Sequence, residues 1–459
     1  MNTLDCYRQT ISADANLTDQ DGKSIMVDCS VTLPLLFGQP VEIRVGIPNE
    51  AMLITNFKTP WQIKTLQGSE MITLEDVHYR SLNTTDTLLK RKLGSTPVDL
   101  SSIKSLTIEM ACKSSGYRFS IYISDTKYFD TLPLEEGHNG ISQIAKFIHP
   151  TLGEVVLQKY SVESAMLSGN GSLKLHGYRL DVECYRPNTS PESIINPIQP
   201  LLDILSFVSR QRVLVLGWEH QTGSEYIRHW KYPLNAVQTN YALYEPRSYL
   251  MSRNVDELEK VINMGLSNYD GLEDSEREMV HKLSFNLCSS VQRRDDTKYM
   301  ALFTGLESYA KKLSLTLELD ETRSRSIQLI KDVAKPHQKD DHKVYQILMN
   351  LTSDIKKAPA ADSIDNFLSK HRVFKKDLWS IRGKNGLLPI RNHLAHEGNH
   401  NVDHQGLAVA TLHLTILIER VILGVLNLEL ESSIQRELRQ EPWLNLEYAN
   451  RLKNLIIPN

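Results

Sequence analysis

The chain has 459 residues, of which 41% are hydrophobic, so it can fill the cores of two or three globular domains and is not a disordered protein. Lys and Arg number 52 against 55 Asp and Glu, and the net charge of −3 excludes a protein that binds nucleic acid through its overall charge; any RNA contact needs a local basic patch. The five cysteines form no CxxC pair, which favours reduced thiols over a disulfide framework or a zinc knuckle.

The first residues contain no basic region followed by an apolar run, so we expect no secretory signal and a cytoplasmic protein. From there to about residue 235, apolar residues recur at every second position, as in Val41, Ile43 and Val45. Turn formers such as Ser115-Gly116 separate these stretches. The pattern predicts a β-rich region over residues 1–250, an antiparallel sandwich or barrel of one or two subdomains. A helix over residues 195–209 is expected to interrupt it.

After about residue 254 the hydrophobic period changes to 3.6, as in Leu302, Leu306 and Leu313. This period predicts an all-α helical bundle over residues 251–459. The boundary falls in residues 244–254, where Pro246 interrupts regular structure. The expected fold class is therefore α+β, with a strand-rich half followed by a helical half.

Residues 406–428 are apolar nearly all the way round a helix, which would suit a membrane span by length. Glu419 and Arg420 lie near the middle of this segment, and a charged pair there favours a buried helix instead. We therefore expect no membrane partner. The same apolar surface suits either the core of one chain or a twofold interface between two chains.

The most informative segment is LPIRNHLAHEG at residues 388–398. Pro389 suits the first position of a helix and Gly398 the residue just past its end, so about two turns are expected between them. Asn392 and His396 then share one face, with Arg391 roughly 140° around the helix from His396. Taken alone, the segment could equally be a polar helix end.

An arginine with a neighbouring polar residue and a histidine a few positions later resembles the active-site motif of the HEPN family, and Arg391, Asn392 and His396 match it. The run RRDDTKYMALFTGLESYA at residues 293–310 is similar to a segment of the Apea-type branch of that family. The resemblance implies a HEPN-like bundle and an endoribonuclease that needs no metal and no cofactor. It also implies a role in abortive phage infection, through cutting of cellular RNA, with tRNA the foremost candidate.

The residues of the motif suit RNA cleavage by the 2′-hydroxyl. Histidine titrates near neutrality, so His396 is the expected base or acid. The planar fork of Arg391 can bind two phosphoryl oxygens, and Asn392 can orient the histidine or the ribose. One histidine supplies only one of the two proton transfers; the HEPN resemblance implies a homodimer or higher homo-oligomer in which two motifs share a cleft. It also leaves the N-terminal half to bind a phage-derived trigger.

A basic segment precedes the motif. Between residues 370 and 391 seven Lys and Arg face one acid, Asp377, with Phe374 and Trp379 interleaved. This segment could hold an RNA backbone and stack a base, although both aromatic residues could equally belong to the core. The residues expected to contact RNA are Lys375, Lys376, Arg382, Lys384 and His393.

A rival pattern overlaps the motif. His396-Glu397-Gly398-Asn399-His400 reads as HExxH, and Glu419 follows at the spacing of a third zinc ligand. An HExxH site needs an unbroken helix, and Gly398-Asn399 is a helix stop. Arg420 is also a more natural partner for Glu419 than zinc. We therefore expect no bound metal.

Two further expectations concern single residues and the alternative function. Glu307 is expected to support the motif through a hydrogen bond, although a helical ion pair with Lys311 is the simpler interpretation. Asp403 is expected to cap the helix that follows it. The alternative to a nuclease is a catalytically silent HEPN module that binds RNA or a nucleotide and serves to oligomerise.

Overall fold

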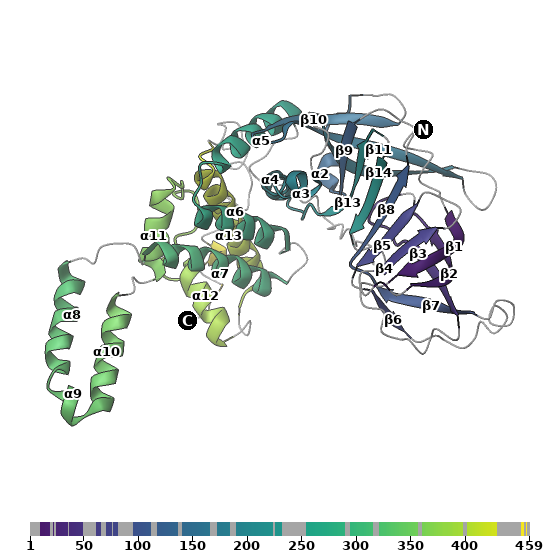
Figure 1. The fold of residues 1–459 in the computed structure, drawn as a ribbon. Coiled ribbons are helices and arrows are strands. Elements are labelled where there is room, and N and C mark those ends of the chain that lie inside the picture. Colours follow the sequence, from purple (N-terminus) through teal and green to yellow (C-terminus); the bar gives the residue numbers. More distant parts are fainter. Residues whose placement is uncertain are drawn as a thin grey trace. The chain divides into compact units, whose positions relative to one another are not determined.

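The computed structural model contains two compact units, a strand unit and a helical unit, and the chain passes from the first to the second within helix α5 (Val255–Tyr269), after Ser267 (Figure 1). The helical unit also includes Ser206–Gln211. The structure describes residues 10–18, 22, 24–34, 36–48, 61–65, 70–75, 77–80, 95–111, 117–135, 140–165, 172–183, 190–223, 225–231, 254–289, 294–314, 321–356, 360–397, 402–428, 451–453 and 456. The segment expected to hold the domain boundary lies almost wholly outside these residues.

The strand unit is built on one 14-stranded sheet, in which every neighbouring pair is antiparallel. The strand order is β10-β11-β12-β9-β13-β14-β8-β5-β4-β1-β2-β3-β7-β6. The strands are β1 (Thr10–Thr18), β2 (Ser24–Thr32), β3 (Glu42–Pro48), β4 (Trp61–Thr65), β5 (Met71–Glu75), β6 (His78–Arg80), β7 (Ser95–Ser102), β8 (Ser105–Ala111), β9 (Tyr117–Ile123), β10 (Ile141–His149), β11 (Gly153–Ala165), β12 (Ser172–Val182), β13 (Val215–Thr222) and β14 (Glu225–Lys231).

One face of the sheet carries the main hydrophobic core. Val41, Ile43 and Val45, whose spacing predicts an inward orientation, are all buried in it. Tyr160 of β11 and Val31 of β2 belong to the same core, although nine strand spacings separate these strands in the sheet order. In a flat sheet nine spacings would span about 40 Å, so the sheet must curl around this core. The α+β fold class is confirmed.

Short helices accompany the sheet: α2 (Lys127–Asp130), α3 (Glu192–Ile195) and the start of α4 (Gln199–Ser209). The single helix expected over residues 195–209 is interrupted between α3 and α4. Pro197 lies in the interruption. Its nitrogen carries no hydrogen to donate to a helical carbonyl, which accounts for the break between the two helices. The predicted apolar face of α4 is confirmed, since Leu201, Leu205 and Val208 are fully buried.

The hydrophobic period of helix α5 predicted that it belongs to the helical domain expected from residue 251 onward. Most of the helix belongs to the strand unit instead. The helix covers β10, which is an end strand of the sheet order. The backbone N–H of Lys146 donates to Glu259 Oε1 at 2.6 Å, and that of Ile148 donates to Asn263 Oδ1 at 2.7 Å. Side chains four apart on a helix match alternate residues of a strand, so α5 satisfies donors that an end strand would otherwise expose.

The helical unit is organised around α7, which packs against α6, α11, α12 and α13. Its helices are α6 (Asp274–Ser289), α7 (Asp295–Ser314), α8 (Glu321–Ala334), α9 (His337–Asp340), α10 (His342–Lys356), α11 (Ala360–Lys370), α12 (Leu387–Glu397) and α13 (His404–Val425). Asp403 caps α13 as predicted, because its carboxylate accepts the N–H of Gly406 at 2.6 Å.

Helix α13 is the one described helix long and apolar enough to cross a membrane, and 83% of its apolar window is buried inside the protein. The prediction of a buried helix over this segment is therefore confirmed. Because the helical unit itself covers this surface, the apolar character of α13 is explained without a second chain. The apolar surface of α13 therefore gives no argument for a twofold interface.

Candidate active site

The motif lies on α12, which begins two residues earlier than its proline predicts. Pro389 is the third residue of the helix and not the first. The helix extends to Leu387 because the N–H groups of Leu387 and Leu388 donate to Ser380 O and Ile381 O at 2.9 and 3.1 Å. Pro389 still lies in the first turn, where its missing N–H would have no helical partner. Gly398, the expected helix stop, lies outside the described residues.

The orientation of α12 is fixed by its apolar side. Leu387, Ile390 and Leu394 recur at helical spacing and are buried, at 0, 1 and 8% exposure. The hydroxyl of Tyr299 on α7 donates to Leu387 O at 2.6 Å, which joins the start of α12 to the central helix. These contacts determine which side chains of α12 reach the solvent.

Arg391 lies at the border of that buried side and pairs with α7. Its Nη2 donates to Glu307 Oε2 at 2.8 Å, and its Nη1 donates to Asn392 Oδ1 at 3.0 Å. The side chain of Glu307 is 8% exposed and that of Arg391 is 26% exposed. Glu307 Oε1 also pairs with Lys311 at 2.7 Å, so both contacts considered for this carboxylate exist together. The structure thus brings Glu307, Arg391 and Asn392 into one network.

His396 and Asn392 lie one turn apart on the exposed side of α12, as their spacing predicts. The amide oxygen of Asn392 accepts a hydrogen bond from Arg391, and its NH2 group is a further hydrogen-bond donor on this side. His393 is half-buried on the flank of the helix. The exposed side of α12 therefore presents an imidazole, an amide donor and the edge of a guanidinium.

Two of the seven basic residues of the segment that leads to the motif are neutralised by helix α11. Lys375 pairs with Asp365, and Arg382 pairs with both Asp362 and Asp365. The expectation of an uncompensated basic patch there is wrong for these two residues, because both acids lie upstream of the segment and become its neighbours only on folding. Lys376 and Lys384 are exposed.

The two aromatic residues of that segment differ. Trp379 is 3% exposed and stacks on His413 with ring centroids 5.1 Å apart, so it belongs to the core and cannot stack a base. Phe374 is 48% exposed, and the Arg420 guanidinium lies 5.6 Å from its ring centre.

The one acid of the basic segment, Asp377, is paired with Arg420. Burial alone would raise the pKa of Asp377, but its hydrogen bonds with Arg420 outweigh burial and lower that pKa below its ordinary value.

The structure also bears on the rival zinc pattern. Glu419 is fully buried and pairs with Arg210, whose Nε donates to Glu419 Oε1 at 2.6 Å. The expected pairing of Glu419 with Arg420 is therefore wrong, because Arg420 binds Asp377 and the partner of Glu419 comes from 209 residues earlier. Within the described residues no cluster of three or more metal-binding side chains occurs. His400 lies outside those residues.

Comparisons with models of known protein families, with curated proteins and with solved structures give no match. The chemistry of the site itself is nevertheless specific. A guanidinium fixed by a buried carboxylate can bind phosphoryl oxygens without first reorganising, and a neighbouring imidazole can transfer a proton.

Proposed function

We propose that the chain is a metal-independent endoribonuclease whose catalytic residues are Arg391, Asn392 and His396. The observation that supports this most is the Glu307–Arg391 pair, which holds the guanidinium in place while 26% of the arginine side chain stays accessible. A surface arginine without such support would lose side-chain entropy on every contact with a phosphate. The arginine here is already ordered.

In the proposed reaction His396 removes the proton of a ribose 2′-hydroxyl, whose oxygen attacks the adjacent phosphorus. The bond to the 5′-oxygen breaks and a 2′,3′-cyclic phosphate remains. Arg391 stabilises the charge that builds on the phosphoryl oxygens, and the NH2 group of Asn392 orients the ribose. The leaving 5′-oxygen needs a proton at the same moment, and the His396 of a second copy supplies it.

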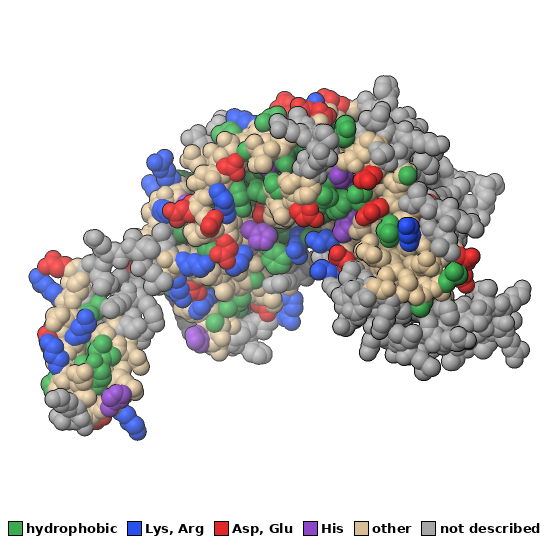
Figure 2. All heavy atoms as spheres, in the orientation of Figure 1, with side chains coloured by type: hydrophobic (Ala, Val, Ile, Leu, Met, Phe, Trp, Pro, Cys, Tyr) green, Lys and Arg blue, Asp and Glu red, His purple; other side chains and the backbone are tan. Residues whose placement is uncertain are grey.

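A second copy requires a surface for pairing, and the helical hairpin of α8 and α10 offers one. Four of its apolar side chains are exposed, Leu329 by 67%, Val333 by 52%, Ile347 by 59% and Leu351 by 45%. Figure 2 shows hydrophobic side chains on the surface of this hairpin. Exposed apolar side chains that gather on one surface mark interaction sites, whereas single ones need no explanation.

Helical geometry places these four side chains on one face of the hairpin. On α8, Leu329 and Val333 lie about 160° and 120° around the helix from the buried Ile327. On α10, Ile347 and Leu351 lie about 140° and 100° around, in the same rotational sense, from the buried Thr352. The two helices run antiparallel, so equal rotations bring both pairs to the same side.

The occupant of this face is a second copy of the hairpin. The four side chains at its centre are uncharged, and the exposed Arg325 and Lys343, one turn further along the same helical rows, border them. Burial of the four side chains in both copies removes on the order of 800 Å² from solvent, which together with a polar rim approaches the low end of specific interfaces, about 1,200 Å². Two hairpins paired in this way form a four-helix bundle.

Light scattering of the purified chain and of two adjacent variants tests the pairing. Ile347→Glu places a charge on the apolar face and should give a monomer, whereas Gln346→Glu adds the same charge on the opposite, polar face and should leave the dimer. A dimer that survives Ile347→Glu would remove the hairpin as the interface while leaving the nuclease proposal in place.

The wider role follows from the family resemblance. The chain as a whole resembles ApeA, an abortive-infection protein, and the bundle of α6, α7, α11, α12 and α13 is proposed to be HEPN-like. In this proposal the strand unit responds to a phage-derived trigger in the cytoplasm, and the nuclease then cuts cellular RNA, with tRNA the foremost candidate.

Incubation of the chain with total RNA in excess chelator separates the proposal from its alternatives. Fragments ending in a cyclic phosphate support the nuclease. Binding without cleavage supports a silent RNA-binding module, and the same result in the presence of phage lysate would exclude a nuclease that is merely untriggered. Cleavage of peptides that stops with chelator would support the zinc interpretation.

A further inference from the structure

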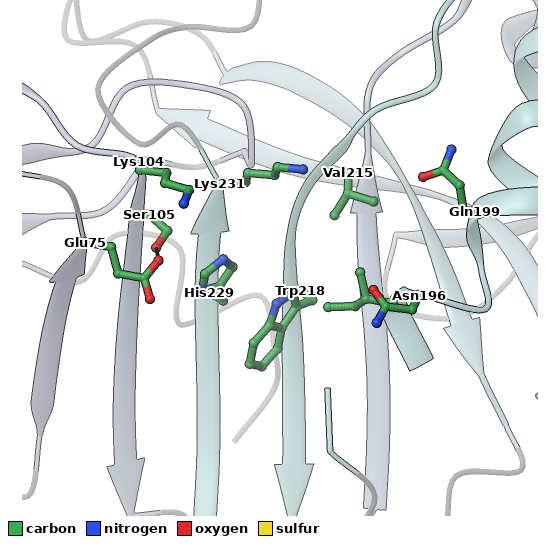
Figure 3. A pocket seen from close by; sticks show the side chains of 10 residues that line it. Glu75, Lys104, Ser105, Asn196, Gln199, Val215, Trp218, His229 and Lys231 are labelled. Atoms are coloured by element: carbon green, nitrogen blue, oxygen red, sulfur yellow. Dashed lines mark hydrogen bonds between the residues drawn. The ribbon is translucent and has the colours of Figure 1, made fainter. Parts of the chain in front are cut away.

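The strand unit contains a cavity of about 570 Å³ on the face of its sheet opposite the main core (Figure 3). Strands β13 and β14 and the start of β8 form its floor, and the turn between α3 and α4 lines one side. The volume lies within the range of small-molecule sites. No motif in the sequence announces this cavity, because its residues come from five separate segments.

The register of the sheet explains how the lining comes together. Lys231 of β14 pairs with Ser105 of β8, and His229, two residues earlier on β14, pairs with Trp218 of β13. Side chains two apart on a strand share a face. Trp230, which lies between Lys231 and His229, points to the other side and is buried in the main core. The polar groups therefore gather on the face that the core does not use.

The floor of the cavity contains two aromatic rings that stack on each other. The rings of Trp218 and His229 are stacked, with centroids 5.1 Å apart and an angle of 12° between their planes. Burial lowers the pKa of His229 to about 4, so its ring is uncharged near neutral pH. Thr107 Oγ1 lies 2.9 Å from Nδ1 of His229 and fixes the orientation of the ring. Trp218 is 8% exposed and also stacks on Phe119, with centroids 5.6 Å apart, so the half-buried ring of His229 is the one on which a planar group can stack.

Charged and amide groups border this surface at different ends. In Figure 3, Lys104 and Lys231 lie above the rings, and Asn196 and Gln199 lie to the right of Trp218, with Gln199 nearer the level of the lysines. Glu75, the carboxylate on the lysine side, accepts the hydroxyl of Ser105 at 2.7 Å. Two ammonium groups at one end can hold an anion, and two amides at the other can both donate and accept hydrogen bonds.

We propose that this cavity binds a nucleoside monophosphate, with its phosphate at Lys104 and Lys231 and its base against the ring of His229, beside the edge of Trp218. The amide of Asn196 then faces the edge of the base. A free inorganic anion would leave the His229 ring unused, and a purely apolar ligand would make no use of the lysines and amides. The site lies in the strand unit and does not depend on the proposed nuclease activity.

Isothermal titration calorimetry of the full chain tests the proposal, with AMP, CMP, GMP and UMP as probes beside the matching nucleosides and inorganic phosphate. We expect at least one monophosphate to bind roughly 10-fold or more tightly than both its nucleoside and phosphate, because only the whole molecule uses both ends of the cavity. The double variant Lys104→Ala with Lys231→Ala should lose this preference, so that monophosphate and nucleoside bind alike.

Two control variants locate the binding. Lys64→Ala removes an exposed lysine of the strand unit outside the cavity, and Arg391→Ala removes the phosphate-binding residue of the proposed nuclease site; both should bind the monophosphate as the unmodified chain does. The proposal is overturned if none of the four monophosphates binds more tightly than its parts. It is also overturned if binding survives the double lysine variant or disappears in Arg391→Ala.

Discussion

Each unit of the molecule contains an arginine paired with a glutamate of low exposure, and the two pairs differ in what the arginine can still reach. In the strand unit, Arg228 Nη2 lies 2.6 Å from Glu219 Oε1, and the arginine side chain is 0% exposed. In the helical unit, Arg391 Nη2 lies 2.8 Å from Glu307 Oε2, and 26% of the arginine side chain is exposed. The Arg228–Glu219 pair is therefore sealed from solvent, as is the Arg210–Glu419 pair of the helical unit, whereas the Arg391–Glu307 pair is open to it.

The difference shows why an ion pair alone does not mark a functional site. Arg228 lies 5.4 Å from the ring centres of both Tyr226 and Trp230, and Glu219 also accepts the hydroxyl of Tyr122 at 2.8 Å. The guanidinium of Arg228 is enclosed by the protein and can only stabilise the fold. Arg391 is fixed from behind by Glu307, while its accessible edge lies on the helix that carries Asn392 and His396.

The largest effect is expected from the open arginine and its histidine. Arg391→Ala and His396→Ala should each lower the rate of RNA cleavage by roughly 10³-fold or more, about 4 kcal/mol of transition-state stabilisation. The His396 side chain is exposed, and Glu307 keeps Lys311 as a partner when Arg391 is replaced, so thermal unfolding should change little. Cleavage rates at equal concentrations of folded protein measure this, and near-normal rates in both variants would remove the site assignment.

The sealed arginine should show the opposite result. Arg228→Ala leaves Glu219 buried without its cation and should cost about 3–5 kcal/mol of the free energy of unfolding of the strand unit. Urea denaturation followed by tryptophan fluorescence measures the loss. As a control, Glu321→Ala removes one partner of the exposed Glu321–Arg325 pair and should cost less than about 0.5 kcal/mol. Equal losses in the two variants would contradict the importance of burial.

The period of the hydrophobic residues correctly predicted which residues of a strand or helix share one face. Alternation placed Val41, Ile43 and Val45 in the core, and a spacing of four placed Asn392 and His396 on one side of α12. It failed for α5, whose helical period does not reveal that its Glu259 and Asn263 serve the edge of a sheet. A period shows the type of an element and not the neighbour it packs against.

The candidate site shows the same limit. The motif on α12 is visible in the sequence, and Glu307 was expected to support it. The neutralisation of Lys375 and Arg382 by α11 and the pairing of Glu419 with Arg210 were not visible. These contacts join residues far apart in the sequence, and charge counted in a window of neighbours does not include them.

The carboxylate behind Arg391 should have a smaller effect than the arginine itself. Glu307→Gln keeps the size of the side chain but removes its charge, so Arg391 loses order and cleavage should fall by roughly 10-fold. Lys311→Ala removes the other partner of Glu307 and should change cleavage by less than about 2-fold. A KM that stays constant while kcat falls in Glu307→Gln would indicate a positioning role in the reaction. A large effect of Lys311→Ala would contradict it.

The smallest effect concerns pH and the strand unit. Burial lowers the pKa of His229 to about 4, so the unfolded chain binds its proton more readily than the folded chain as pH falls below about 6.5. The free energy of unfolding should therefore fall by about 1–2 kcal/mol more between pH 7 and 5 in the unmodified chain than in His229→Gln. Denaturation curves at both pH values measure the difference, and identical losses would show that His229 is not held neutral by the fold.

The ends of RNA cut in excess chelator test the central claim most directly. If Arg391 and His396 drive attack by the 2′-hydroxyl, the unmodified chain leaves 2′,3′-cyclic phosphate and 5′-hydroxyl ends, and His396→Ala leaves the RNA intact. Ends carrying a 3′-hydroxyl and a 5′-phosphate, or equal cleavage by His396→Ala, would contradict the account.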